Sequence, residues 1–166
     1  MSDHTRIGHG WDLHQLAPVS PPGEARPLRL GGIDIDHHSG PVSYSDGDAL
    51  LHAITDALLG AVGLDDLGTR YPNSDPTWKD ANSADLLRDA WADVRAQGWR
   101  VGNLDATVIC ESPKISPLRD AIRTNVAALL DCETAQVNVK GKTHEGLDAI
   151  GEGLAIEVHA VAVLVR

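Results

Sequence analysis

The sequence predicts an α/β fold of the two-layer α+β type, in which a mixed β-sheet has helices packed on one face. Strand-like and helix-like segments alternate along the chain, which is the pattern of a sheet layered with helices. The 166 residues, of which 42% are hydrophobic, suffice for one core and are too few for two comfortable domains. We therefore expect a single domain that comprises residues 1–166.

The N-terminal part of the chain favours extended structure. Residues 5–8 and 11–16 are typical of strands, and a proline-rich loop at 17–23 follows them. Beyond this loop, residues 28–30 and 33–35 alternate apolar and polar side chains, as a half-buried strand does.

Three later segments have the periodicity of helices. The first is expected to begin near Asp46 or Asp48 and to end at Gly60, because acidic residues suit a helix N-terminus and glycine suits its end. Its apolar stripe comprises Leu50, Leu51, Ile54 and Leu58. The second follows a cap at 82–83 and stops at Gly98. The third opens at Ser116-Pro117, since proline is favoured at the first helical position.

Residues 106–110, 136–140 and 154–165 are rich in strand-forming residues. The last of these segments is apolar on both sides: Ile156, Val158 and Leu164 share one face, and Val161, Val163 and Val165 share the other. Helices would cover one face of the sheet. We expect another copy of the subunit to cover the second face.

The net charge of −10 argues against two classes of binding partner. Polymeric nucleic acids and anionic membranes need a basic face, so neither is expected, whereas a metal and a few lysines still permit a small anionic substrate. The longest apolar stretch, 160–165, is too short to span a bilayer, and the N-terminus has no apolar signal segment. Cys110 and Cys132 are expected to be reduced, and the protein to be cytoplasmic.

The first chemical motif is a set of candidate metal ligands. In a strand, Asp12 and His14 point the same way, so a carboxylate and an imidazole converge on one point. On the first helix, Asp48 and Asp56 flank His52 at four residues on either side and are expected to orient its ring. Three such ligands and one open position are the pattern of a catalytic zinc site. The alternative for His52 is a surface histidine paired with an acid.

Two further segments suit phosphate binding. Residues 140–145 place lysines, Thr143 and Glu145 in one turn, where they suit phosphate oxygens and a second, harder cation; the alternative is a polar hairpin. Residues 111–114 join a strand to a helix and suit a nucleotide or phosphate, or form an ordinary capped turn. His37 and His38 have no partner pattern and are expected to be solvated.

Taken in order, these segments resemble the 2-C-methyl-D-erythritol 2,4-cyclodiphosphate synthase family. The resemblance spans nearly the whole chain, and its two most specific motifs are RIGHGWDLH at 6–14 and SDGDALLHAITDALLGA at 45–61. The other matching segments are DLGTRYPNSDP at 66–76, NSADLL at 82–87, GNLDATVICESPK at 102–114 and VNVKGKTHEGL at 137–147.

The resemblance implies a homotrimer whose sheets face the threefold axis, with active sites between neighbouring subunits. It implies the cyclisation of 4-diphosphocytidyl-2-C-methyl-D-erythritol 2-phosphate to the 2,4-cyclodiphosphate, with release of CMP, in non-mevalonate isoprenoid biosynthesis. The 2-phosphate of the substrate is the nucleophile, so catalysis consists mainly of positioning and charge neutralisation.

The resemblance also implies residue roles. Zinc would be held by Asp12, His14 and His52, and a second ion, magnesium or manganese, by Glu145. Thr143 would act at the transition state, with Tyr44 at the position of a family histidine. The substrate-binding residues would be Ser45, Asp66, Gly68, Tyr71, Asn73, Asp75, Cys110, Pro113, Lys114, Ile115 and Lys142.

The chain departs from the family pattern at two places. Tyr44 replaces a phosphate-contacting histidine, so a potential cation is lost. Residues 148–153 are shorter than the family segment and lack its aromatic residue and its arginine. Two alternatives follow: a zinc protein of the same fold that acts on a different nucleotide-diphosphate substrate, and a non-catalytic, ligand-binding trimer.

Overall fold

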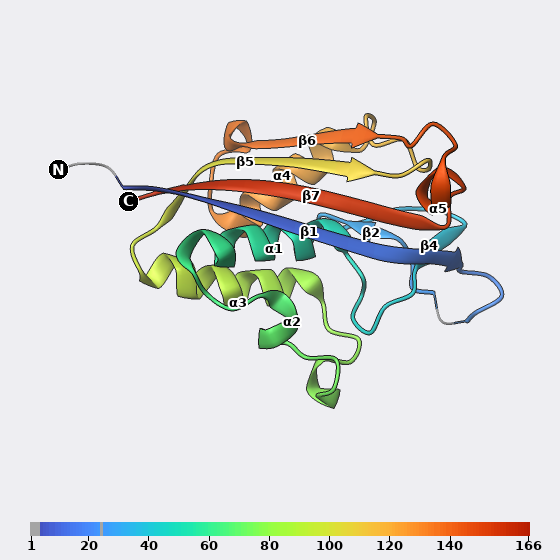
Figure 1. Ribbon diagram of the computed structural model, residues 1–166, viewed down its shortest axis with the longest axis horizontal. Helices are drawn as coiled ribbons and strands as arrows, with labels where there is room; N and C mark the ends of the chain where they lie inside the picture. The colour runs from blue at the N-terminus through green and yellow to red at the C-terminus, as the bar shows by residue number, and fades with distance from the viewer. Residues whose placement is uncertain (1–3, 24) are drawn as a thin grey trace.

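The computed structural model describes residues 4–23 and 25–166 and has the expected mixed sheet with helices. The five-stranded sheet has the order β4-β1-β7-β5-β6 (Figure 1). Its strands are β1 (Thr5–Pro18), β4 (Ser39–Pro41), β5 (Arg100–Ile109), β6 (Val137–Lys142) and β7 (Ala155–Val165). Strands β5 and β6 run parallel, whereas β7 is antiparallel to both β1 and β5, so the sheet is mixed as expected.

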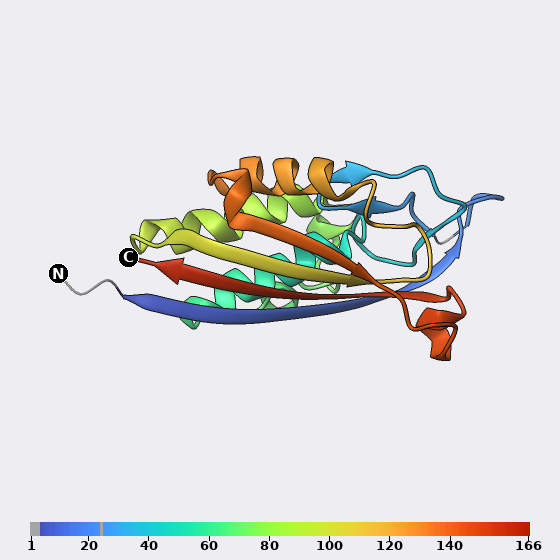
Figure 2. The same ribbon diagram turned by 90° about the horizontal axis from the view of Figure 1, so that it is seen from above.

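The helices are α1 (Ala49–Val62), α2 (Leu67–Arg70), α3 (Ser83–Ala96), α4 (Arg119–Leu130) and α5 (Asp148–Gly151), with short 3-10 turns at Pro76–Trp78 and Thr134–Gln136. Helices α1, α3 and α4 lie on one side of the sheet, and α5 lies beyond its end (Figure 2). The segments 28–30 and 33–35 form a separate hairpin of β2 (Arg29–Leu30) and β3 (Ile33–Asp34).

Burial follows the two-residue period of the strands. Along β7, the side chains from Ile156 to Leu164 at even positions are buried under the helices, while those at odd positions are partly exposed on the open face. The open face also presents the large apolar side chains of Ile7, Trp11, Leu13 and Val161. Among the described residues, no helix is both long enough and apolar enough to cross a membrane.

Helix α1 packs against β1 without intervening side chains. A Cβ atom at Gly10 would lie 1.8 Å from the carbonyl oxygen of Ala53, and one at Gly8 would lie 1.8 Å from that of Ala57. The neighbouring positions on β7 are Ala160 and Ala162. Only small residues permit this approach of a helix to a sheet.

Two expected helix boundaries are wrong. Helix α1 continues past Gly60 to Val62, because Gly63 adopts φ 74° and ends the helix with its N–H bonded to the carbonyls of Leu59 and Gly60. The third helix, α4, does not open at Ser116-Pro117, since these residues belong to a turn in which the Leu118 N–H bonds the Ile115 carbonyl. Its first residue is Arg119.

The N-terminal caps of α1 and α3 are residues that the sequence predicted. The Asp48 side chain accepts a hydrogen bond from the Leu51 N–H at the start of α1. The Asn82 side chain accepts one from the Ala84 N–H at the start of α3.

We expect Gly10→Ala to lower the free energy of unfolding by about 3 kcal/mol or more, because the added Cβ forces α1 away from β1. Urea denaturation of this variant measures the loss. Gly60→Ala is the matched control on α1, since a Cβ there meets nothing within 4 Å and should stabilise the helix by up to about 1 kcal/mol. Equal stabilities of the two variants would contradict the close packing.

Candidate active site and metal centre

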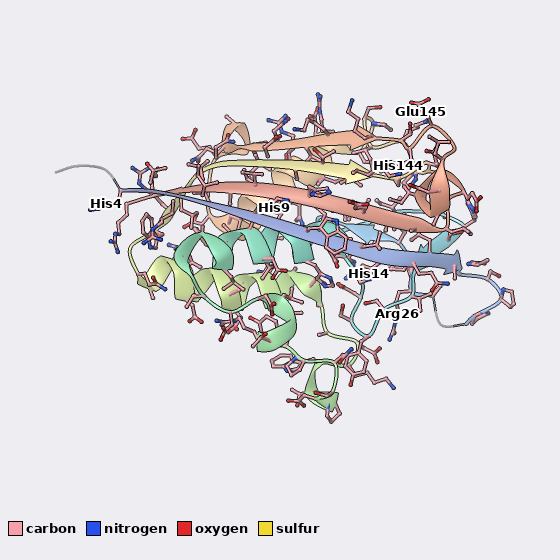
Figure 3. All side chains as sticks on the ribbon, in the orientation of Figure 1. His4, His9, His14, Arg26, His144 and Glu145 are labelled. Carbon is pink, nitrogen blue, oxygen red and sulfur yellow. The ribbon has the colours of Figure 1, made fainter. Side chains whose placement is uncertain are left out.

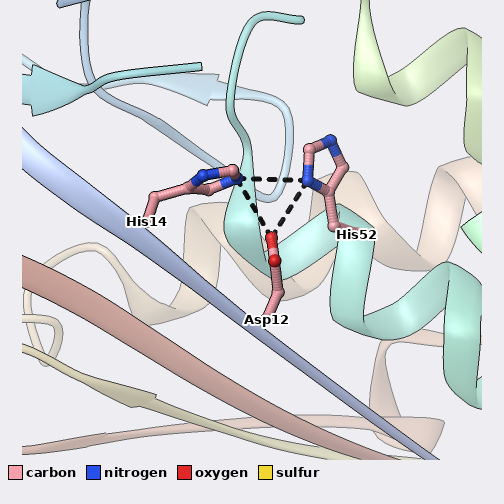
Figure 4. A group of neighbouring side chains, drawn as sticks. All are labelled: Asp12, His14 and His52. Atoms are coloured by element: carbon pink, nitrogen blue, oxygen red, sulfur yellow. Dashed lines mark hydrogen bonds and ion pairs between the residues drawn. The ribbon is translucent and has the colours of Figure 1, made fainter. Parts of the chain in front are cut away.

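Asp12, His14 and His52 converge at the junction of β1 and α1 (Figure 4). Asp12 Oδ2 lies 3.1 Å from His14 Nε2 and 3.0 Å from His52 Nδ1, and the two ring nitrogens are 3.3 Å apart. Donors about 2.0–2.2 Å from a tetrahedral ion are separated by about 3.3–3.6 Å, so small shifts of these side chains accommodate a divalent cation. One carboxylate oxygen and two imidazoles are a donor set that suits zinc.

The three side chains are largely buried, and their charges are coupled. Burial alone raises the pKa of Asp12, but hydrogen bonds and attraction from His14 and His52 outweigh it and hold that pKa far below its ordinary value. Burial opposes protonation of His52, yet the Asp12 carboxylate raises the net pKa of His52 above its ordinary value. The carboxylate is therefore ionised and ready to act as a ligand at neutral pH.

The second ring nitrogen of His52 is oriented by a serine from α3. Ser83 Oγ lies 2.8 Å from His52 Nε2 and also donates to the Asp46 carboxylate, which accepts the Ser83 N–H at 3.0 Å as well. Ser45 Oγ is a more distant partner of the same nitrogen, at 3.4 Å. Hydrogen bonding to the second nitrogen fixes the rotation of a ligating imidazole.

The expectation that Asp48 and Asp56 orient His52 is wrong. The Asp48 carboxylate is fully buried and accepts the backbone N–H groups of Gly31, Gly32 and Leu51. The Asp56 carboxylate accepts the N–H of Leu67 at the start of α2. Both carboxylates are occupied by backbone donors, so neither is directed at the ring. No local spacing reveals Ser83, which is 31 positions from His52 and reaches it only through the packing of α3 on α1.

The metal-ligand cluster opens into a pocket of about 430 Å³. Five residues expected at the site line this pocket with the cluster: Tyr44, Ser45, Gly68, Tyr71 and Asn73. Asp66 and Asp75 do not line it; their carboxylates accept the N–H groups of Thr69 and Thr77 and cap short helical turns. Trp78 and Leu86 also line the pocket and were not singled out by the sequence pattern.

A second pocket, of about 570 Å³, lies at the β6 edge of the sheet. Its lining includes the other expected residues, which are Cys110, Pro113, Lys114, Ile115, Lys142, Thr143 and Glu145. Lys140 and Arg119 line it too, so cations predominate here in a chain of net charge −10. This charge suits phosphate groups.

The two pockets have no lining residue in common. Strands β7 and β5 lie between β1 and β6, so about 14 Å of sheet separates their strands. Figure 3 shows His14 beside β1 and Glu145 beyond the opposite edge. Within one chain, the metal-ligand cluster and the Thr143–Glu145 turn therefore form separate half-sites.

Two smaller expectations concern histidines and thiols. His37 is not simply solvated as expected, because its Nε2 lies 3.0 Å from Ser112 Oγ, whereas His38 is exposed. Cys110 and Cys132 are free thiols, as expected.

We expect Ser83→Ala to weaken zinc binding at the cluster by about tenfold to a hundredfold, because His52 loses the partner that orients it. Competition with a chromophoric chelator measures the affinity. Ser45→Ala is the control and should have a smaller effect, since its contact is longer. Unchanged zinc affinity in Ser83→Ala would show that the hydrogen bond plays no part.

Burial raises the pKa of the Cys110 thiol to about 11, and the nearby Glu111 carboxylate adds to the rise. About one thiol in a thousand is then ionised at pH 8, so alkylation should be slow there and should accelerate about tenfold per pH unit up to pH 10. Mass spectrometry after iodoacetamide treatment of a Cys132→Ser variant isolates Cys110. Reaction at pH 8 as fast as that of free cysteine would contradict this prediction.

Comparisons with known proteins agree with this architecture. A family model described as the YgbB family matches residues 5–165. The 2-C-methyl-D-erythritol 2,4-cyclodiphosphate synthase of Chromobacterium violaceum is 52% identical over 161 residues, which cover 97% of this chain and 98% of the relative. The chloroplastic synthase of Oryza sativa subsp. japonica is 48% identical over 161 residues, which cover 97% of this chain and 70% of the relative.

Solved structures of relatives share the fold. IspF from Plasmodium falciparum, solved as a CDP complex, has a TM-score of 0.84 and 39% identity over 98% of this chain and 96% of its own. The bifunctional IspDF from Campylobacter jejuni has a TM-score of 0.91 and 39% identity; the match covers 99% of this chain and 43% of that one. A family match from β1 to β7, together with relatives about half identical over nearly the whole chain, shows that this chain belongs to the YgbB family of 2-C-methyl-D-erythritol 2,4-cyclodiphosphate synthases.

Proposed function

We propose that this protein converts 4-diphosphocytidyl-2-C-methyl-D-erythritol 2-phosphate to 2-C-methyl-D-erythritol 2,4-cyclodiphosphate and CMP, as a CMP-releasing phosphorus–oxygen lyase of non-mevalonate isoprenoid biosynthesis. The observation that carries the proposal is the convergence of Asp12, His14 and His52 in a chain whose relatives bear the name of this synthase. All of residues 1–166 act as one domain.

The reaction needs positioning more than proton transfer. The 2-phosphate oxygen attacks the β-phosphorus and the bond to CMP breaks, so no external nucleophile is consumed. Zinc held by Asp12, His14 and His52, with magnesium or manganese at Glu145, supplies neutralisation of phosphate charge when bound. Lys142 and Thr143 contribute an ammonium and a hydroxyl on the second pocket, where they hold phosphate oxygens.

The other pocket residues bind different parts of the substrate. Cys110, Pro113, Lys114 and Ile115 form the cytidine end of the second pocket. Two solved relatives whose titles name CDP support a nucleotide substrate. Ser45, Gly68, Tyr71 and Asn73 hold the methylerythritol end beside the metal-ligand cluster, with Asp66 and Asp75 shaping the turns around it. Tyr44 lines the same pocket, and its hydroxyl donates a hydrogen bond to the Asp75 carbonyl at 3.3 Å, which orients the phenol.

A homotrimer unites the two half-sites. The open face of the sheet exposes Ile7, Trp11, Leu13 and Val161, and burial of such a face is a strong driving force for assembly. Three copies arranged with these faces toward a threefold axis bring the metal-ligand cluster of one subunit against the Thr143–Glu145 turn of the next. The separation of the two pockets within one chain supports this arrangement.

Phosphorus NMR of the protein with the cytidyl substrate, zinc and magnesium tests the reaction. We expect stoichiometric CMP and cyclic diphosphate. Zinc-loaded protein that leaves this substrate unchanged would overturn the proposal, and turnover of another nucleotide diphosphate, or ligand binding alone, would establish one of the two alternatives.

Mixing two inactive variants tests whether the site is shared between subunits. His52→Ala removes a zinc ligand and Glu145→Gln removes a ligand of the second ion, so each homotrimer should lose nearly all turnover. Every mixed trimer retains one site with both halves intact, so equal co-expression should restore about a quarter of wild-type activity. No recovery in mixed trimers, confirmed by differential tags, would place the complete site within one chain.

A further inference from the structure

A second histidine cluster lies on the open face of the sheet, on the side opposite the Asp12–His14–His52 cluster. His9 on β1 and His159 on β7 are diagonal neighbours, since Trp11 pairs with His159 and His9 pairs with Val161. His9 Nε2 lies 3.1 Å from His159 Nδ1, with the rings stacked at a centroid distance of 5.3 Å. Figure 3 shows His9 where β1 and β7 lie side by side.

The tautomer of His159 is set by a carboxylate. His159 Nε2 lies 2.8 Å from Glu157 Oε1, so this nitrogen carries the proton and donates it to the carboxylate. The indole N–H of Trp11 donates to the same oxygen at 2.9 Å and holds it in place. The free lone pair of His159 is therefore on Nδ1, directed at His9.

We propose that His9 and His159 form a second binding site for a divalent transition-metal ion such as zinc. Two nitrogens about 2.0–2.1 Å from one ion lie about 2.8–3.4 Å apart for angles between about 90° and 110°, and the observed 3.1 Å falls within this range. Glu157 bonds the non-ligating nitrogen of His159, which is the usual way in which proteins orient a metal-bound imidazole. Both side chains are accessible to an ion in the single chain, because His9 is exposed and the His159 side chain is 41% exposed.

This site differs in kind from the proposed catalytic centre. Its ligands are two imidazoles from adjacent strands, with no carboxylate contacting the ion, so borderline cations that favour nitrogen are preferred over magnesium or calcium. An ion here links β1 to β7 on the face proposed to turn toward neighbouring subunits. The metal site itself needs neither the cyclisation activity nor the trimer, since both ligands come from one chain.

Zinc titration in a His52→Ala background, where the first cluster is disabled, tests the inference. With ¹⁵N-histidine NMR, we expect the ring signals of His9 and His159 to shift together on zinc addition. We expect Glu157→Gln to weaken the site by about tenfold, because it removes the charge that orients His159. His38→Gln, on an exposed loop, is the control and should leave the shifts unchanged.

His159→Gln, compared with its parent by circular dichroism to verify folding, should lose the zinc-dependent shift of His9. Zinc that leaves both ring signals unmoved, or a His9 shift that persists in His159→Gln, would overturn the site and leave the pair as a plain hydrogen-bonded contact. Neither outcome bears on turnover of the cytidyl substrate, which is measured separately with the wild-type protein.

Discussion

The contact between the backbones of α1 and β1 is the constraint on which the rest of this structure depends. Gly8 and Gly10 leave no side chain between strand and helix. The carbonyl oxygens of Ala57 and Ala53 therefore lie only 1.8 Å from where Cβ atoms on Gly8 and Gly10 would be. This contact brings His52, one position before Ala53, within 3.0 Å of the Asp12 carboxylate, two positions after Gly10. A larger residue at either glycine would separate the ligands as well as the layers, so the packing and the proposed chemistry share one requirement.

Two acidic residues just before α1, Asp46 and Asp48, support the site in different ways. Asp48 is buried and binds three backbone N–H groups, which anchors the β2–β3 hairpin to the first turn of α1. Burial raises the pKa of Asp48, and its backbone donors oppose the rise. Asp46 instead holds Ser83, whose hydroxyl meets His52. The Asp48 carboxylate therefore positions α1, and the Asp46 carboxylate positions the His52 ring through Ser83.

Even-numbered and odd-numbered residues of β1 lie on opposite faces of the sheet, and the two faces carry different functional groups. On β1, Asp12 and His14 share the helix-covered face with the glycines, whereas His9 and Trp11 occupy the open face. The covered face offers burial, which strengthens the coupling between Asp12 and the histidines. The open face offers exposed apolar side chains for assembly and the imidazole pair that we assign to a second ion. A shift of one residue in the register of β1 would exchange these faces.

The sequence alone determined the features that depend on near neighbours. Alternation along strands placed Asp12 and His14 on one side, and the caps at Asp48 and Asn82 set two helix starts, since strand direction and capping involve only a few residues. Tertiary structure decided what depends on distant contacts: that Ser83, and not Asp48 or Asp56, orients His52, that His9 meets His159 150 positions away, and that the pockets lie apart. It also decided that α1 ends at Gly63 and not at Gly60. Both glycines are suitable helix ends by sequence, but in the folded chain it is Gly63 that adopts the left-handed conformation. Such pairings arise when layers pack, and no local periodicity encodes them.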